Sequence, residues 1–149
     1  DVASLRQRQM CIRDRAGADL NGCTWHTRAT GGMFVELAGR DTSRSMPLGY
    51  GCKKQGGSAL HTAEAELVCL ATFTRNEFLP MQILMQKLLG RPVELIVHEE
   101  NNACISIARK GYSPSLRCLP RSHRISIGVV HETYAEPPPP GFGAATLMY

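Results

Sequence analysis

One long helical segment in the middle of the chain constrains the fold most. Residues 58–79 read SALHTAEAELVCLATFTRNEFL, which is rich in the helix formers Ala, Leu and Glu, and Ser58 is a candidate N-cap. Pro80 interrupts the pattern. Residues 81–90 then predict a second helix, ended by Gly90. A helical segment of this length must bury one side against another layer of structure.

The segments on either side of these helices supply that layer. Two strands joined by a turn are predicted over residues 31–39 and 46–52. A third strand is predicted over residues 93–99, in which Val93, Leu95 and Val97 alternate with Glu94, Ile96 and His98. Residues 101–110 predict a helix ending at Gly111, and residues 122–134 read as either a closing helix or a strand. This order predicts an α/β fold with a mixed sheet.

The two ends of the chain differ in composition from the middle. Residues 1–15 contain the string RQRQMCIRDR, which resembles a translated sequencing adaptor; the alternative is a disordered basic arm. Residues 135–149 contain four consecutive prolines, which predict a disordered, extended tail. We therefore expect one domain over residues 16–134, with a first strand that the adaptor has truncated.

Charge and hydropathy narrow the classes of function. The 149 residues carry a formal net charge of +4, of which four arginines and two aspartates place +2 within residues 1–15. The total is a weak argument for a nucleic-acid partner, so a local basic patch matters more. No apolar run is long enough to span a bilayer, and the N-terminus has no signal-peptide core. We expect an intracellular protein with reduced cysteines and no membrane contact.

Four segments, in the same order and spacing, resemble the RNase H domain of copia-type retrotransposon polyproteins. They are GADLNGCTWHTRATGG (17–32), CKKQGGSALHTAEAELVCL (52–70), VELIVHEENNACISIA (93–108) and RSHRISIGVVHE (121–132). The resemblance implies an RNase H-like mixed sheet with flanking helices. It also implies an endonuclease that hydrolyses the RNA strand of an RNA–DNA hybrid.

The chemistry of that family requires several converging carboxylates. Two Mg²⁺ (or Mn²⁺) ions activate the attacking water and stabilise the leaving oxygen, and such ions prefer oxygen ligands. The resemblance further implies the reverse transcriptase portion of the same polyprotein as a partner. It implies a cytoplasmic or virus-like-particle location.

Carried over residue by residue, the resemblance predicts a damaged acidic site. Glu66 matches the helix glutamate, and Glu100 matches the aspartate before Asn, with one added methylene. Gly17 replaces the first metal-binding aspartate, and Ser126 replaces the fourth acid. Asp19 points to the same face of a strand as residue 17 and is the candidate substitute. We expect Asp19, Glu66 and Glu100 to be the catalytic and metal-binding set, with impaired catalysis.

Two further features leave alternatives open. Periodicity does not choose between Glu64 and Glu66, and only the resemblance favours Glu66. Basic residues that could contact a nucleic-acid backbone flank two predicted loops; they are Lys53, Lys54, Arg121 and Arg124.

Two other functions remain open at this stage. A non-catalytic remnant would keep the fold and bind nucleic acid weakly. A small zinc-binding interaction module would use Cys23 and His26, spaced as C-x-x-H, with distant ligands.

Overall fold

A mixed five-stranded sheet forms the centre of the molecule. The structure, a computed structural model, describes residues 10–20, 25–39 and 44–149. The strands are β1 Met10–Asp19, β2 Thr30–Gly39, β3 Ser45–Lys54, β4 Glu94–His98 and β5 Ala145–Met148. Their order is β3-β2-β1-β4-β5. β2 is antiparallel to both β1 and β3, whereas β4 is parallel to β1 and to β5. The predicted α/β class with a mixed sheet is confirmed.

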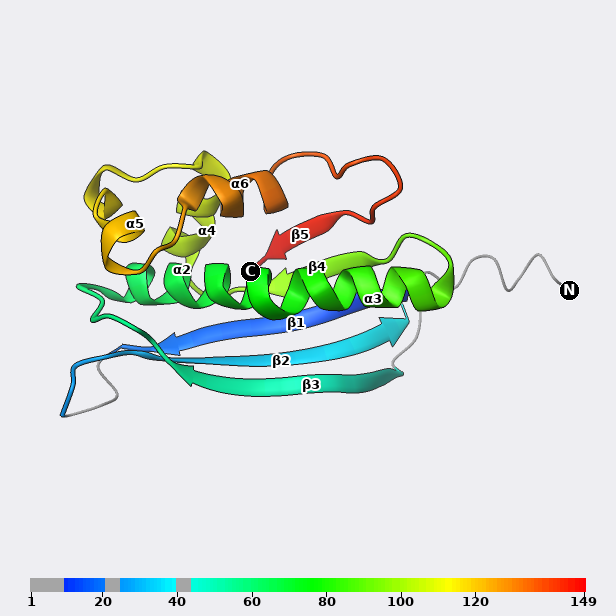
Figure 1. The fold of residues 1–149 in the computed structure, drawn as a ribbon, viewed down its shortest axis with the longest axis horizontal. Coiled ribbons are helices and arrows are strands. Elements are labelled where there is room, and N and C mark those ends of the chain that lie inside the picture. The colour runs from blue at the N-terminus through cyan, green and yellow to red at the C-terminus, as the bar shows by residue number, and fades with distance from the viewer. Residues whose placement is uncertain (1–9, 21–24, 40–43) are drawn as a thin grey trace, which may run out of the picture.

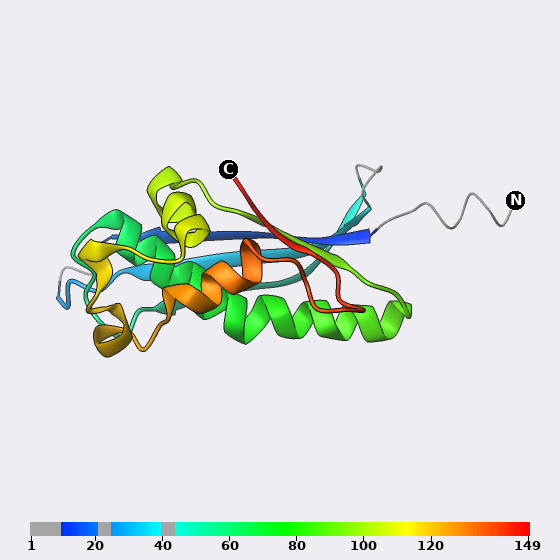
Figure 2. The same ribbon diagram turned by 90° about the horizontal axis from the view of Figure 1, so that it is seen from above.

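The helices pack beside this sheet in two groups (Figures 1 and 2). The first is a continuous rod made of α2 Thr62–Phe73, the π-helical turn η1 Thr74–Phe78 and α3 Leu79–Leu89. The second comprises α4 Asn102–Lys110, the 3₁₀ turn η2 Pro114–Leu116, α5 Leu119–Ser122 and α6 Ile127–Tyr134. Residues 127–134 are thus helical, which decides the choice left open by the sequence. No helix in the described ranges combines the length and apolar character needed to cross a bilayer.

The predicted helix of residues 58–79 begins later and does not stop at Pro80. The N-cap is His61, whose Nδ1 accepts the N–H of Glu64 at 3.2 Å, and not Ser58. Pro80 is the second residue of α3 and lies within the continuous rod. The π-helical turn η1 precedes it and carries the chain from one helix into the next.

The core lies between the rod and the sheet. Leu67, Leu70 and Phe78 from the rod pack against strand residues such as Ile12 and Leu95, all fully buried. Each such side chain contributes roughly 1.5–3 kcal/mol on burial. The rod is therefore held rigidly over β1, which fixes any side chain that α2 directs toward the ends of the strands.

The N-terminal boundary differs from the expected one. β1 is ten residues long and begins at Met10, so the strand is not truncated at residue 16. Cys11 and Ile12 are buried in the sheet centre. Residues 10–15 are therefore an ordered strand and not a disordered arm; residues 1–9 lie outside the described part of the chain.

The proline-rich segment also differs from a disordered tail, because its end completes the sheet. The N–H of Leu95 donates to the Ala144 carbonyl and that of Glu99 donates to the Met148 carbonyl, each at 2.8 Å. Gln82 Nε2 on α3 donates to the carbonyl of Gly143 at 3.0 Å. The ordered structure therefore extends to residue 148. Local composition did not predict this, because the strand that β5 pairs with lies about fifty residues earlier in the chain.

We expect Gly143→Val to detach this last strand. A Cβ at Gly143 would overlap the Val93 carbonyl oxygen, so the backbone must move apart. The free energy of unfolding should fall by about 1–3 kcal/mol, measured by urea denaturation. Hydrogen exchange at the Leu95 amide should accelerate. Thr146→Val, on the exposed side of β5, is the matched control; equal effects of both changes would contradict this account.

Candidate functional site

An acidic hollow forms where β1 and β4 part. The two strands stay paired as far as Arg15 opposite His98, after which β1 continues to Asp19 while the chain after β4 turns into α4. The resulting cavity has a volume of about 290 Å³. Its acidic lining consists of Glu66 from α2 with Glu99 and Glu100, and its floor includes Gly17 and Gly32. Open α/β sheets commonly bind ligands at such carboxyl ends of parallel strands.

Glu99 is the most buried of these acids, with 1% of its surface exposed. Its Oε1 accepts the N–H of Asn101 at 3.0 Å, whereas Oε2 has no hydrogen-bond partner. Burial raises its pKa to about 7, and the nearby charges of Glu66 and Glu100 add to the effect. Glu99 is not among the acids that the resemblance assigns to the site. The signal that identifies it is the alternation of buried Val93, Leu95 and Val97, which continues to residue 99.

Glu66 approaches the same hollow from the rod. Burial raises its pKa, a hydrogen bond with the Ala18 backbone opposes that rise, and the charge of Glu100 adds to it. Its Oε2 is buried without a hydrogen-bond partner. Glu100 itself is exposed. Two of the three predicted acids, Glu66 and Glu100, therefore meet here.

The third predicted acid, Asp19, is not among the residues that line the hollow. It is exposed at the end of β1, opposite Thr30. Gly17, two residues earlier, lines the hollow, and a Cβ built there meets no atom within 4 Å. Its carbonyl accepts the thiol of Cys69 at 3.2 Å. The strand thus brings a position without a side chain to the lining of the hollow.

The acids present do not fit a preformed pair of metal ions. Across the described residues, no group of three or more His, Cys, Asp or Glu side chains is arranged to hold a metal. Two carboxylate oxygens, from Glu66 and Glu99, lack partners and remain open to a cation or a proton donor. The arrangement is consequently short of ligands on the β1 side.

Glu64, the competitor of Glu66, has a structural role. Its Oε2 accepts the N–H of Leu60 at 2.7 Å, and its Oε1 lies 3.8 Å from His123 Nε2. These contacts join the start of α2 to the loop after α5. Ser126, which stands at the position of the fourth family acid, is exposed at the N-cap of α6 and does not line the hollow.

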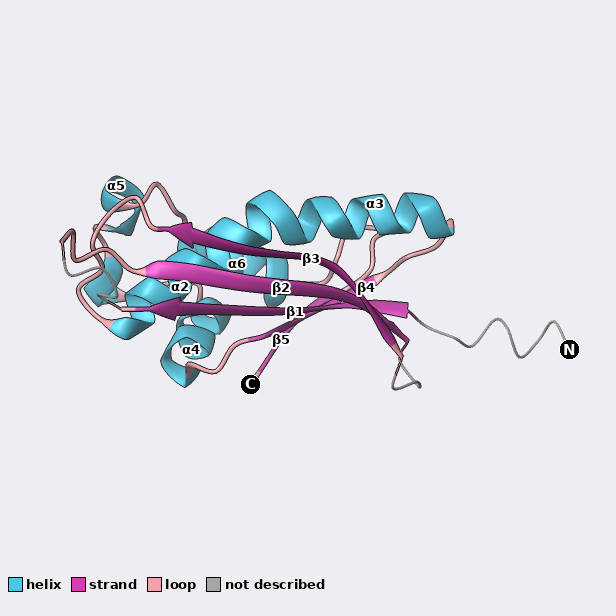
Figure 3. Ribbon diagram, turned by 90° about the horizontal axis from the view of Figure 1, so that it is seen from below, coloured by secondary structure: helices cyan, strands magenta, loops and turns pink. Residues whose placement is uncertain are grey.

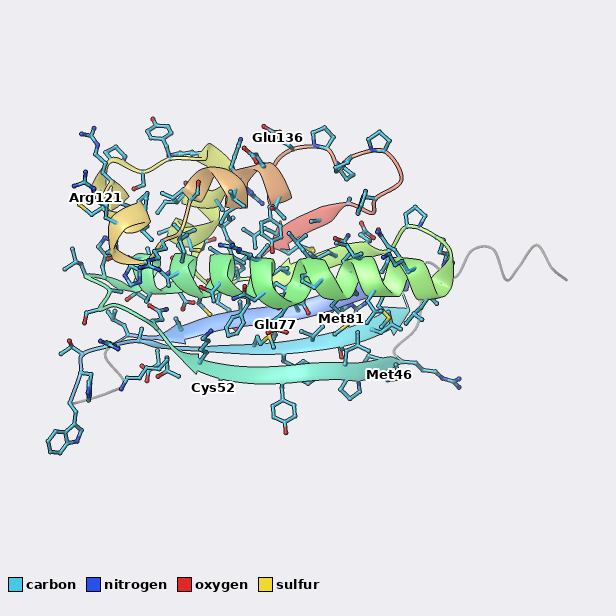
Figure 4. The ribbon with its side chains drawn as sticks, viewed as in Figure 1. Met46, Cys52, Glu77, Met81, Arg121 and Glu136 are labelled. Carbon is cyan, nitrogen blue, oxygen red and sulfur yellow. The ribbon has the colours of Figure 1, made fainter. Side chains whose placement is uncertain are left out.

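Three of the four predicted basic residues line a second cavity. Lys53 and Lys54 at the end of β3 and Arg124 after α5 line a cleft of about 400 Å³. Arg121 lies on α5, outside this lining (Figure 4). Gln55 anchors the loop, because its buried side chain donates to the Ala65 carbonyl at 2.7 Å. Three basic side chains therefore lie around one cleft.

The zinc alternative gains no support from the described residues. Cys23 lies outside them, and His26 lies in a segment between β1 and β2. Among the described residues, His26 belongs to no group of three or more His, Cys, Asp or Glu side chains that could hold a metal ion.

Comparisons with known proteins identify no family for this chain. No protein-family model matches it, and no curated protein matches it. Among solved structures, it is similar to the N-terminal RNase H domain of Rv2228c from Mycobacterium tuberculosis, solved as a fusion with maltose-binding protein. The identity is 12% over 95% of this chain and 83% of that chain, with a TM-score of 0.42. It is also similar to LC11-RNase H1, isolated from compost by a metagenomic approach. Here the identity is 19% over 74% of this chain and 69% of that chain, with a TM-score of 0.38.

Proposed function

We propose that this chain is an RNase H-like domain of a copia-type retrotransposon polyprotein whose catalysis is impaired. The observation that carries the proposal is the meeting of Glu66, Glu99 and Glu100 beside Gly17 at the end of β4. Glu66 and Glu100 come from the helix and from the strand end to which the sequence resemblance assigns them, and Glu99 is the residue before Glu100. The ancestral reaction is hydrolysis of the RNA strand of an RNA–DNA hybrid.

The impairment follows from the β1 side of the hollow. A two-metal site needs carboxylates on both sides of the scissile phosphate, and Mg²⁺ accepts little deviation from octahedral oxygen geometry. Gly17 supplies no carboxylate there. Asp19 remains the candidate replacement, and it would have to reach back along the strand by two residues, about 6.6 Å.

Binding to the sugar–phosphate backbone of a nucleic acid does not need the missing carboxylate, whereas cleavage does. Lys53, Lys54 and Arg124 are proposed to contact phosphates of a hybrid, with Arg121 extending the basic surface along α5. Such contacts need charge and reach but no metal. The alternative, a non-catalytic remnant that still binds nucleic acid, rests on the same cleft. The proposed protein partner is the reverse transcriptase portion of the same polyprotein. The proposed location is the cytoplasm or a virus-like particle.

We also propose that residues 1–15 derive from a sequencing adaptor. What supports this is Asp14, which is 1% exposed in the sheet centre and has no hydrogen-bond partner for either carboxylate oxygen. A native strand at this position would be expected to carry an apolar residue, because an unpaired buried carboxylate costs several kcal/mol.

Hybrid cleavage by purified, folded protein tests the main proposal. We expect slow cleavage of a labelled RNA–DNA hybrid in Mn²⁺ or Mg²⁺, abolished in Glu66→Ala and unchanged in Glu94→Gln, at the other end of β4. Binding should weaken with salt and in the Lys53→Ala/Lys54→Ala double variant. Binding without cleavage would favour the non-catalytic alternative. If the folded protein neither binds nor cleaves the hybrid, both proposed functions are contradicted.

A further inference from the structure

The second half of the helical rod carries most of its apolar side chains near the surface. α2 buries seven of its twelve residues, whereas in α3, which is described in full, the one buried residue is Gln82. The sequence of α3, LPMQILMQKLL, is nevertheless mostly apolar. A helix this short depends on the packing of its apolar side, since it is marginal in isolation. The exposed side of α3 therefore lacks the cover that α2 has.

Four of these apolar residues form one exposed surface. Leu84 and Leu88 lie one turn apart on the same side of α3 and are 48% and 69% exposed. Ile83 and Leu89 beside them are also exposed. In Figure 3, α3 runs along the border of the molecule, and no other described helix or strand lies on its outer side. We call Ile83, Leu84, Leu88 and Leu89 the α3 patch; contiguous exposed apolar residues of this kind mark a contact surface.

An apolar cavity of about 310 Å³ opens beside the α3 patch. It is lined by Leu79 and Ile83 from α3, by Val129 from α6 and by Phe142 from the proline-rich segment. Ile83, Val129 and Phe142 are exposed, so the cavity is open at the surface. The one charged residue of its lining is Glu132 on α6. The cavity therefore suits an apolar side chain with a cation next to it.

The α3 patch itself carries that combination. Leu88 is the most exposed large apolar residue of the rod, and Lys87 precedes it. Leu88 does not line the cavity of its own chain. Lys87 and Glu132 are both exposed, and neither forms an ion pair with another described residue. A second copy of the chain can thus supply both groups.

We propose that two copies of the chain associate through their α3 patches about a two-fold axis. The two α3 helices run antiparallel and cross near Leu84. Leu88 of each copy then lies opposite Pro80 of the other, because both are four residues from the crossing point. That position is next to Leu79 and Ile83 of the second copy, so Leu88 enters the cavity that these residues line.

The same arrangement pairs opposite charges. Lys87 faces Glu132 at the cavity of the second copy, and the two-fold axis forms each contact twice, as in any isologous interface. The acidic hollow lies beyond the α2 half of the rod, at the far end of β1 from α3 (Figure 1). The dimer therefore leaves the hollow open, and its formation requires neither hydrolysis nor nucleic acid.

Sedimentation velocity of the purified chain over a range of concentrations, without metal or nucleic acid, tests the proposal. The parent should show a reversible equilibrium between monomer and dimer. Leu88→Ala should weaken the dimer on the order of a hundredfold, as the loss of a buried anchor on both sides does. Leu60→Ala, at an 87% exposed site before α2, is the matched control and should dimerise as the parent does. Circular dichroism verifies that each variant is folded.

Charge reversal tests the pairing separately from the loss of apolar surface. Lys87→Glu and Glu132→Lys should each weaken the dimer by roughly tenfold, because like charges then face each other at both contacts. The double variant Lys87→Glu/Glu132→Lys should recover most of the affinity of the parent, since each pair is again of opposite charge. Recovery of this kind does not follow from any effect of the substitutions on folding.

Three results would overturn the proposal. A parent that remains a monomer at every concentration would leave the α3 patch to a different protein. A dimer that Leu88→Ala leaves intact would use another surface of the chain. A double variant that dimerises no better than the single reversals would exclude the contact between Lys87 and Glu132. Because the assay contains neither metal nor hybrid, its failure would leave the proposed hybrid cleavage untouched, and the reverse also holds.

Discussion

Gly17→Asp is expected to raise metal-dependent cleavage of an RNA–DNA hybrid on the order of a hundredfold above the parent chain. The expectation comes from the cost of misplacing a catalytic group, since about 1 Å can change a rate by about 10². The substitution adds a carboxylate to the hollow that Glu66, Glu99 and Glu100 line. The new side chain enters open space, because a Cβ at Gly17 meets no atom within 4 Å.

Gly17→Asn is the matched control, since it has nearly the same shape without the charge. We expect Mn²⁺ to raise the melting temperature of Gly17→Asp and to raise that of Gly17→Asn much less, a readout that does not depend on catalysis. Gly49→Asp, on β3 with equally open space, tests for a general effect of added charge. Equal activity and equal metal response in all three variants would refute the placement of the site.

Asp14→Val is expected to raise the free energy of unfolding by several kcal/mol at pH 8. Asp14 lies between Val35 and Val97 on the adjoining strands, all three buried, and both of its carboxylate oxygens lack partners. Burial raises its pKa from 3.8 to about 8. A rise of this size corresponds to at most about 6 kcal/mol of stability lost on ionisation. Valine has a similar volume and carries no charge.

The free energy of unfolding of the parent chain should depend on pH, and the raised pKa of Asp14 determines the direction of that dependence. The folded state holds the Asp14 proton more tightly than the unfolded chain, so the contribution of Asp14 to stability is greatest below pH 3.8 and is lost as the pH rises to about 8. Urea denaturation at a series of pH values should show this fall. Asp14→Val should show a much shallower one, due to Glu99, whose pKa is raised to about 7. Parallel curves for parent and variant would contradict a buried, unpaired Asp14.

Local signals in the sequence were sufficient for most of the elements. Gly90 and Gly111 end their helices with positive φ angles of 64° and 75°, as terminal glycines should. Asn101 caps α4 by accepting two backbone N–H groups. These features depend on a few adjacent residues, and the sequence contains them in full.

Long-range pairing accounts for what the sequence analysis missed. Residues 145–148 have no strong strand pattern of their own, and they form β5 because the edge of β4 and the side chain of Gln82 offer partners. At the candidate site, the alternation of side chains along a strand correctly predicted that Asp19 and Gly17 lie on the same face of β1. The sequence could not predict that the pairing of β4 with β1 ends at Arg15. Because the pairing ends there, the hollow lies beside Gly17, and Asp19 does not line it.

The order of the strands has a consequence for how the chain acquires its structure. The hairpin of β1 and β2 and that of β2 and β3 join neighbouring segments, whereas β1 pairs with a strand about eighty residues later and β4 with one about fifty residues later. Contacts so distant in sequence slow folding, because loop entropy is lost before they form. During synthesis the three-stranded meander can form first, with β1 as its open edge. Until β4 arrives, that edge is exposed to pairing with other chains, so the yield of folded protein should depend on how quickly residues 94–148 follow.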